Sequence, residues 1–124
     1  MTDTFDFGDG PVSAHRHLNP NGNLGGWVAE TAHVESSAHV GWGARVYGRA
    51  WVYGHALVSG NAQVYGHAHV VGGAQVFGDA RVFGRAQVSG GAWVSGDAEV
   101  SGYAQVYDDA HVYDNARVSG HTLV

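Results

Sequence analysis

Valine recurs at every sixth position along most of the chain. It fills 17 consecutive positions of this period, from Val28 to Val124, without an insertion. Two residues before each valine stands a small residue, which is Gly26 at the start, alanine through the series and Thr122 at the end. Two residues after the valine, the chain has glycine at every repeat from Gly48 to Gly102. An α-helix needs apolar residues at a period of about 3.6 and tolerates glycine poorly, so the pattern excludes a helix.

Short β-strands explain the spacing. Side chains alternate between the two faces of a strand, so an alanine and a valine two residues apart face the same way and the residue between them faces outward. Each six-residue unit is therefore predicted to be a strand of roughly four residues followed by a corner. Glycine suits the corner because it has no Cβ and adopts positive φ without a steric cost. Asp108 and Asp114 interrupt the glycine series, which Gly120 restores.

Residues 26–124 resemble the hexapeptide-repeat proteins, in which an aliphatic residue points inward and a small residue fills each tight corner. The resemblance implies an all-β, single-domain, left-handed parallel β-helix with a triangular cross-section and three hexads per coil. Seventeen hexads then make five to six coils. The variant A-x-V-[YSF]-G-x, entered through NLGGWVAETAHV (residues 23–34), is similar to a subgroup of bacterial and phage-borne proteins of the YdcK type. It departs from the commoner pattern, which places the small residue directly after the aliphatic one.

The two ends of the repeat raise different expectations. Residues 1–25 lack the period and carry apolar side chains such as Phe5 and Phe7 among glycine, aspartate and asparagine, so we expect them to cap the first coil. At the other end the series closes on a core position. Either the last coil frays or a second subunit covers it, and the second interpretation predicts self-association. The residues expected to take part are Tyr107, Tyr113, Leu123 and Val124.

Composition and charge exclude several classes of function. The net charge is −5, and the chain has six arginines and no lysine, so no basic patch for nucleic acid is expected. No apolar run reaches the length of about 18 residues that a membrane span needs. The N-terminus has no secretory signal, which predicts a cytoplasmic protein. The absence of cysteine excludes disulfides and thiol chemistry.

The outward positions form columns, because residues 18 apart lie on neighbouring strands about 4.8 Å apart. Aromatic ladders in such columns can simply support the sheet. Trp51 and Trp93 fit this explanation less well, since we expect these single exposed indoles to have no stacked aromatic partner. Aromatic residues and arginine are enriched where binding energy concentrates, so we predict a surface that binds a protein partner. Its expected residues are Tyr47, Trp51, Tyr53, Tyr65, Phe83, Arg45 and Arg81.

Catalytic and metal chemistry receive less support from the sequence. Zinc needs three or four converging ligands, and His55, His67 and His69 do not reproduce the spacing of the carbonic-anhydrase type of hexapeptide protein. The column of Asn61, Asp79, Asp97 and Asn115 could supply calcium ligands, but corner geometry explains it better. No metal or other cofactor is therefore expected.

An acyltransferase is the alternative function. Such enzymes usually add an extruded loop with a catalytic histidine, whereas residues 26–124 run without interruption. A histidine at a junction between subunits could still act as general base with acyl-CoA, and the candidates are His33, His39, His55, His67 and His69. A trimer would favour this alternative.

The preferred hypothesis is a non-catalytic module that self-associates, most simply as a dimer, and presents an aromatic and arginine face to an unidentified protein. For a gene carried by a phage or mobile element, the resemblance implies a host-directed inhibitor.

Overall fold

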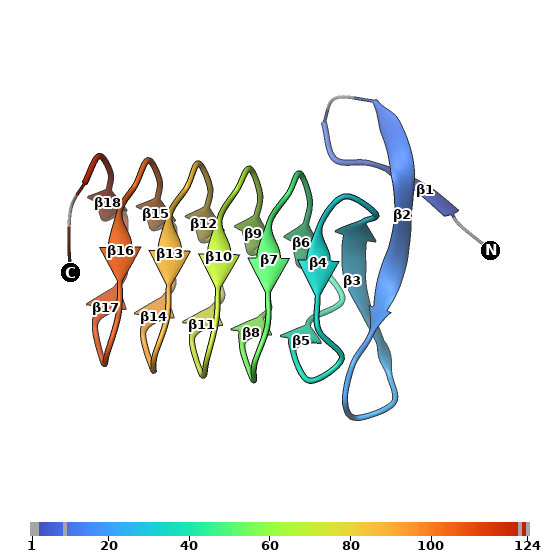
Figure 1. The fold of residues 1–124 in the computed structure, drawn as a ribbon, viewed down its shortest axis with the longest axis horizontal. Coiled ribbons are helices and arrows are strands. Elements are labelled where there is room, and N and C mark those ends of the chain that lie inside the picture. Colours follow the sequence, from blue (N-terminus) through green and yellow to red (C-terminus); the bar gives the residue numbers. More distant parts are fainter. Residues whose placement is uncertain (1–2, 9, 122, 124) are drawn as a thin grey trace.

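The chain forms a coil of short parallel strands (Figure 1). The computed structural model describes residues 3–8, 10–121 and 123, and no helix occurs among them. The strands lie in three sheets, which we call A, B and C. Sheet A contains β1 (Asp3–Asp6), β2 (Pro11–Leu18), β3 (Leu24–Ala29), β6 (Arg45–Val46), β9 (Gln63–Val64), β12 (Arg81–Val82), β15 (Glu99–Val100) and β18 (Arg117–Val118). Sheet B contains β4 (His33–Val34), β7 (Trp51–Val52), β10 (His69–Val70), β13 (Gln87–Val88) and β16 (Gln105–Val106). Sheet C contains β5 (His39–Val40), β8 (Leu57–Val58), β11 (Gln75–Val76), β14 (Trp93–Val94) and β17 (His111–Val112).

Every third strand pairs in parallel, which confirms the predicted β-solenoid. Val46 pairs with Val64 and Val64 with Val82, so one coil takes 64 − 46 = 18 residues, or three hexads. Sheets B and C each hold five described strands, which corresponds to about five turns. The handedness of the coil and its triangular cross-section stay predictions.

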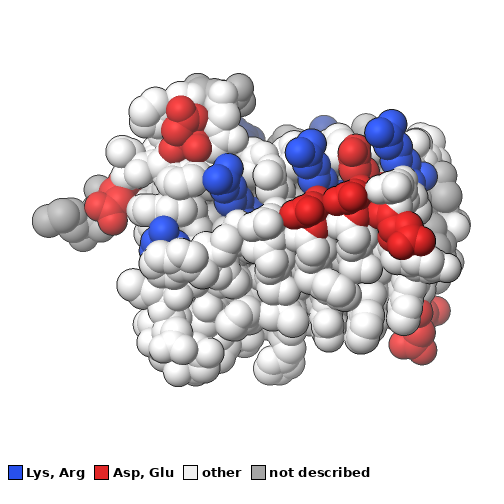
Figure 2. All heavy atoms as spheres, turned by 180° about the vertical axis from the view of Figure 1, so that it is seen from behind, with Lys and Arg blue, Asp and Glu red and all other residues white. Residues whose placement is uncertain are grey.

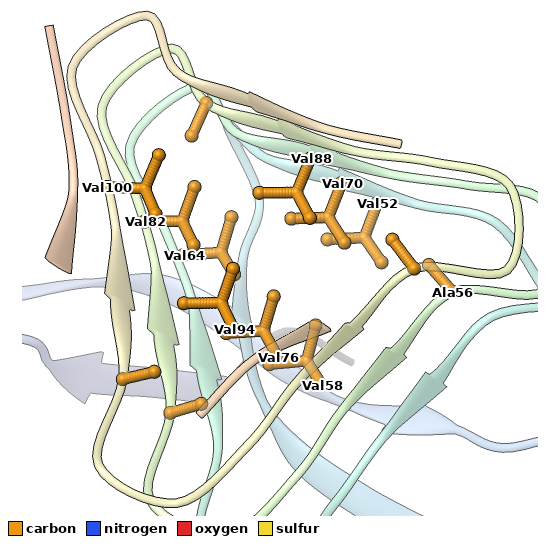
Figure 3. Close-up of a cluster of buried hydrophobic side chains, with 14 of the residues drawn as sticks. Val52, Ala56, Val58, Val64, Val70, Val76, Val82, Val88, Val94 and Val100 are labelled. Carbon is orange, nitrogen blue, oxygen red and sulfur yellow. The ribbon is translucent and has the colours of Figure 1, made fainter. Parts of the chain in front are cut away.

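The core consists of the valines and alanines that the period identified. Val40 to Val106 and Ala38 to Ala104 are at most 1% exposed at every repeat. Figure 3 shows valines from the three sheets in three rows that point toward one another. Burying each valine contributes about 1.5–3 kcal/mol before the entropy of ordering the chain is subtracted. Because each coil covers its neighbours, stacking stabilises the fold.

The corners have the positive φ that the glycine series predicts. From Gly48 to Gly102, and again at Gly120, φ lies between 63° and 73°. Asp108 and Asp114 replace glycine and adopt the same conformation, with φ of 54° and 56°. The substitution therefore changes the residue but keeps the corner. The regular strands are two residues long rather than the predicted four, because the corner takes up the rest of each hexad.

The N-terminal segment extends sheet A. β1 and β2 form an antiparallel pair, and β2 also pairs antiparallel with β3. The other edge of β3 pairs in parallel with β6, the first strand of the regular series in this sheet. In Figure 1, β2 stands along the N-terminal end of the coil. The division into a cap of residues 1–25 and a coil of residues 26–124 stays a prediction, and β3 lies across that boundary.

Two buried polar side chains satisfy the open backbone of sheet C at this end. Asn19 accepts a hydrogen bond from Val40 N at 2.8 Å and donates one from Nδ2 to Val40 O at 3.0 Å. Its amide therefore takes the place of a peptide group on a neighbouring strand. His17 Nε2 donates to Ala38 O at 2.8 Å. Burial lowers the pKa of His17 below its ordinary value, against a smaller opposing effect of this hydrogen bond.

Glycine is required where β3 meets the first coil. A Cβ on Gly26 would overlap the carbonyl oxygen of Ala44, and a Cβ on Gly25 would overlap that of Val40. This close backbone approach explains why the small residue of the first hexad is Gly26, whereas the following hexads have alanine.

Candidate interaction surface

The residues predicted to bind a partner lie on two sheets that meet at one corner of the coil. Arg45 and Arg81 are on β6 and β12 of sheet A, and Tyr47, Tyr65 and Phe83 directly follow strands of this sheet. Trp51 is on β7 of sheet B, and Tyr53 directly follows that strand. The residues between them, Gly48 and Arg49 in one coil, form what we call the A–B corner.

The aromatic side chains after the strands of sheet A form a continuous stack. The ring centroids of Tyr47 and Tyr65 are 4.8 Å apart, and those of Tyr65 and Phe83 are 5.0 Å apart, with nearly parallel planes in both pairs. Phe7 extends the stack to four rings, because it lies 4.7 Å from Tyr47. Half-buried rings in such a ladder support the sheet and present mainly their edges to solvent.

Burial also raises the pKa of Tyr65. The nearby Arg81 guanidinium opposes this effect, and the Glu99 carboxylate adds to it by a smaller amount. The Tyr65 hydroxyl is therefore neutral at physiological pH.

The two arginines of the predicted surface have different surroundings within the chain. The Arg45 guanidinium lies 5.0 Å from the centre of the Phe5 ring, which itself stacks on Trp27 at 5.0 Å. Arg81 stands opposite Glu99 on the neighbouring strand. Figure 2 shows arginines and acidic residues gathered together on the face seen from behind. Through Phe5, the N-terminal segment thus occupies part of the surface that was predicted to bind a partner.

Trp51 and Tyr53 are the more accessible part of the predicted surface. The Trp51 side chain is 47% exposed and has edge contact with Tyr53 at 6.2 Å. The expectation that the exposed indoles lack stacked aromatic neighbours is wrong. Trp51 lies between His33, at 5.1 Å, and His69, at 6.1 Å. The stacking partners are imidazole rings, which are aromatic and stand in the same column as Trp51.

Trp93 on sheet C also has a stacked aromatic neighbour, contrary to the expectation for the exposed indoles. Its ring stacks on His111 at 5.0 Å, with planes 4° apart, and has edge contact with Phe77 at 5.7 Å. Its side chain is 40% exposed, close to the value for Trp51. Exposure alone therefore does not distinguish the two indoles.

Sequence reasoning missed one aromatic and arginine cluster. The Arg16 guanidinium lies 3.5 Å from the Trp42 ring centre and 4.8 Å from that of Trp27, and it donates to Gly25 O. Trp42 is 64% exposed. The single available signal was a tryptophan at the position between Gly41 and Gly43, where later hexads have glycine.

The residues predicted to self-associate lie around the C-terminal end. Tyr107 and Tyr113 directly follow β16 and β17, and Leu123 forms an isolated bridge with Gln105. All three are exposed, whereas Val124 lies outside the described residues. A hollow of about 440 Å³ opens at this end, and its lining residues are His111, Val112, Tyr113, Asp114, Ala116 and Val118.

The described residues were also compared with the requirements of a metal site and of a membrane-spanning helix. Within residues 3–8, 10–121 and 123, no three histidine or carboxylate side chains are arranged to hold a metal ion. The same residues include no helix long and apolar enough to cross a membrane. Asn61 donates to Asp79 at 3.2 Å, so this corner column makes a local hydrogen bond.

Comparison with known proteins agrees with the repeat architecture. The YdcK beta solenoid repeat family model matches residues 50–66, 74–90 and 104–120. Comparisons with curated proteins and with solved structures found no match. The three matched segments lie within the coil of parallel strands described above. The chain is therefore a β-solenoid repeat protein, in which these three segments are similar to the YdcK beta solenoid repeat.

Proposed function

We propose that this β-solenoid is a non-catalytic module that binds a protein partner through Trp51 and Tyr53. The observation that carries the proposal is the half-exposed Trp51 indole, which β7 and its neighbours β4 and β10 hold on the outside of sheet B. A tryptophan and a tyrosine fixed by paired strands lose little conformational entropy on binding. The edges of the Tyr65 and Phe83 rings and the Arg81 side chain extend this surface across the A–B corner.

A comparison of two tryptophan variants tests the partner surface. Wild type, a Trp51→Ala/Tyr53→Ala variant and a Trp93→Ala variant would be immobilised and exposed to the same host extract, with chemical crosslinking. We expect wild type and Trp93→Ala to retain one common protein that the double variant loses. Equal retention by all three would overturn the proposal, because Trp93 has similar exposure on a different sheet.

We also propose that the module self-associates as a dimer through its C-terminal end. In the described residues, β17 pairs only with β14, and β18 pairs only with β15, so both have an open edge on the other side. Open parallel edges beside exposed apolar groups favour pairing with another chain. Two copies that meet at this end would cover Tyr107, Tyr113 and Leu123.

Light scattering during size-exclusion chromatography tests this second part. We expect the mass of a dimer for wild type and of a monomer for Tyr113→Asp, because a carboxylate would be buried without a partner. The matched control is Tyr53→Asp on sheet B, which should remain dimeric. A monomeric wild type would overturn the proposal. A trimer would do so as well, and binding of acyl-CoA would then be measured.

A further inference from the structure

A polar hollow lies at the A–B corner, in the middle of the coil. Its volume is about 410 Å³, and its lining residues are His67, His69, Arg85, Gln87 and Tyr103. They come from three successive coils: His67 N donates to Gly84 O, and Arg85 N donates to Gly102 O. His69 stands opposite Gln87 in the register of β10 and β13. The hollow therefore collects corner and strand side chains that the 18-residue coil places next to one another.

All five side chains of this hollow can donate hydrogen bonds. Arginine has five N–H donors, a glutamine amide has two, a neutral imidazole has one and a tyrosine has its hydroxyl. In the part of the chain that the structure describes, none of the five makes a side-chain hydrogen bond. The Arg85 guanidinium lies 5.8 Å from the centre of the Tyr103 ring.

The hollow is free of acidic residues although the chain is acidic overall. The protein has 11 aspartates and glutamates, but none occurs in the four segments that build this corner and the adjoining sheet B, which are 47–53, 65–71, 83–89 and 101–107. Arg85 has no ion-pair partner among residues 3–8, 10–121 and 123, where the one ion pair joins His15 to Glu30. Arg81 also makes no ion pair among these residues, but it differs from Arg85 in standing opposite the acidic Glu99 on the neighbouring strand.

We propose that this hollow is a binding site for a phosphate group. A guanidinium presents a planar fork that matches phosphate oxygens, and hydrogen bonds with a charged partner are the stronger ones. Donors arrive from both imidazoles, the amide and the hydroxyl as well as from Arg85, which suits a group with three terminal oxygens. The absence of carboxylates removes the repulsion that an anion would meet elsewhere on this chain. The site adjoins the proposed partner surface, since His69 also contacts the Trp51 ring, but its lining includes neither Trp51 nor Tyr53.

Titration of the imidazole resonances tests the site. Histidine ring signals of the full chain would be followed by NMR while inorganic phosphate is added at constant ionic strength and pH. We expect saturable shifts at His67 and His69 and not at the other seven of the nine histidines. Arg85→Gln should weaken the apparent affinity about tenfold or more, because it removes the charge-assisted hydrogen bonds. Arg81→Gln, which removes the same charge from the neighbouring sheet, should leave the affinity unchanged.

Two further measurements make the outcome decisive. Arg85 is exposed, so its variant should unfold at the wild-type temperature, and Arg85→Lys should retain part of the affinity. Shifts that never saturate, that spread over all histidines or that persist in Arg85→Gln would overturn the proposal. Phenyl phosphate in place of inorganic phosphate identifies the source: tighter binding of the ester indicates a phosphate carried on a larger molecule, and tighter binding of the inorganic ion indicates free phosphate.

Discussion

At the N-terminal end of the solenoid, β5 has its open edge covered by the side chains of His17 and Asn19, whereas at the C-terminal end β17 pairs only with β14 in the described residues. Burial follows this difference. Val40, on β5, is fully buried, while Ala116, in the last described coil, is exposed.

The comparison shows that a periodic coil does not by itself supply hydrogen-bond partners for the strands at its ends. Every hexad satisfies its backbone through the hexads 18 residues before and after it, so each end leaves one set of strands without a partner. The non-repeating N-terminal segment supplies that partner for two sheets. In sheet A it adds β2 beside β3, and at sheet C the side chains of His17 and Asn19 bond the open edge of β5. Sheet B is covered less well there, since β4 pairs only with β7 among the described strands and Val34 is partly exposed.

The largest expected effect comes from the glycine at the covered end. Gly26→Ala should lower the free energy of unfolding by about 3 kcal/mol or more, because its Cβ would overlap the Ala44 carbonyl oxygen and force the backbone apart. Gly120→Ala at the other end meets nothing within 4 Å and should cost about 1 kcal/mol, from its positive φ alone. Urea unfolding of both variants measures the difference, and equal losses would remove the distinction between the ends.

The side-chain amide of Asn19 should have the next largest effect. Asn19→Ala leaves the Val40 N–H and C=O without partners in a buried setting, which should cost about 2–3 kcal/mol. Asn61→Ala is the matched control, since Asn61 is exposed and its one side-chain hydrogen bond is to exposed Asp79. We expect that control to change stability by less than about 0.5 kcal/mol. A loss in Asn19→Ala no greater than in the control would show that the amide does not satisfy the strand edge.

Core valines should become less important toward the open end. Val70→Ala, in the middle of the coil, should cost about 2 kcal/mol, because the valine is fully buried and its neighbours cannot collapse onto the space. Val118→Ala should cost about half as much, since Val118 is partly exposed. Thermal unfolding of the pair compares the two positions. Similar losses would indicate that something covers the C-terminal end in solution, as the proposed dimer would.

The smallest effect concerns the pH dependence of the covered end. Because the pKa of His17 is lowered in the folded protein, the unfolded chain binds a proton more readily, and stability should decline as the pH falls below about 6.5. His17→Gln removes this contribution, so its stability should change less than that of wild type between about pH 7.5 and 5.5. His55→Gln, at an exposed corner, serves as the control. Identical pH profiles of wild type and His17→Gln would contradict the assignment.

The candidate surface was only partly predictable. The outward columns followed from the period together with the three hexads per coil that the resemblance implies, and the stacked rings of Tyr47, Tyr65 and Phe83 lie where the columns place them. The contacts of Trp51 with the imidazoles of His33 and His69 also follow from the columns, since the three residues are 18 apart. The packing of Phe5 against Arg45 could not be predicted, because residues outside the repeat have no periodic relation to those within it.

The resemblance to the hexapeptide-repeat proteins implied the 18-residue coil, whereas the valine and alanine core and the glycine corners were readable in the order of the amino acids. This was possible because each of these features depends on local geometry repeated at a constant interval, so 17 copies of one pattern reinforce a single solution. The contacts that cover the N-terminal end of the coil could not be predicted from the period. The Asn19 side chain makes hydrogen bonds that a neighbouring strand would otherwise make. Gly26 stands where later hexads have alanine, because a Cβ would overlap the Ala44 carbonyl oxygen. The Phe7 ring stacks on Tyr47, which is far from it in the sequence. These contacts form between a non-repeating segment and the first coil, and their geometry exists only once the chain has folded back on itself.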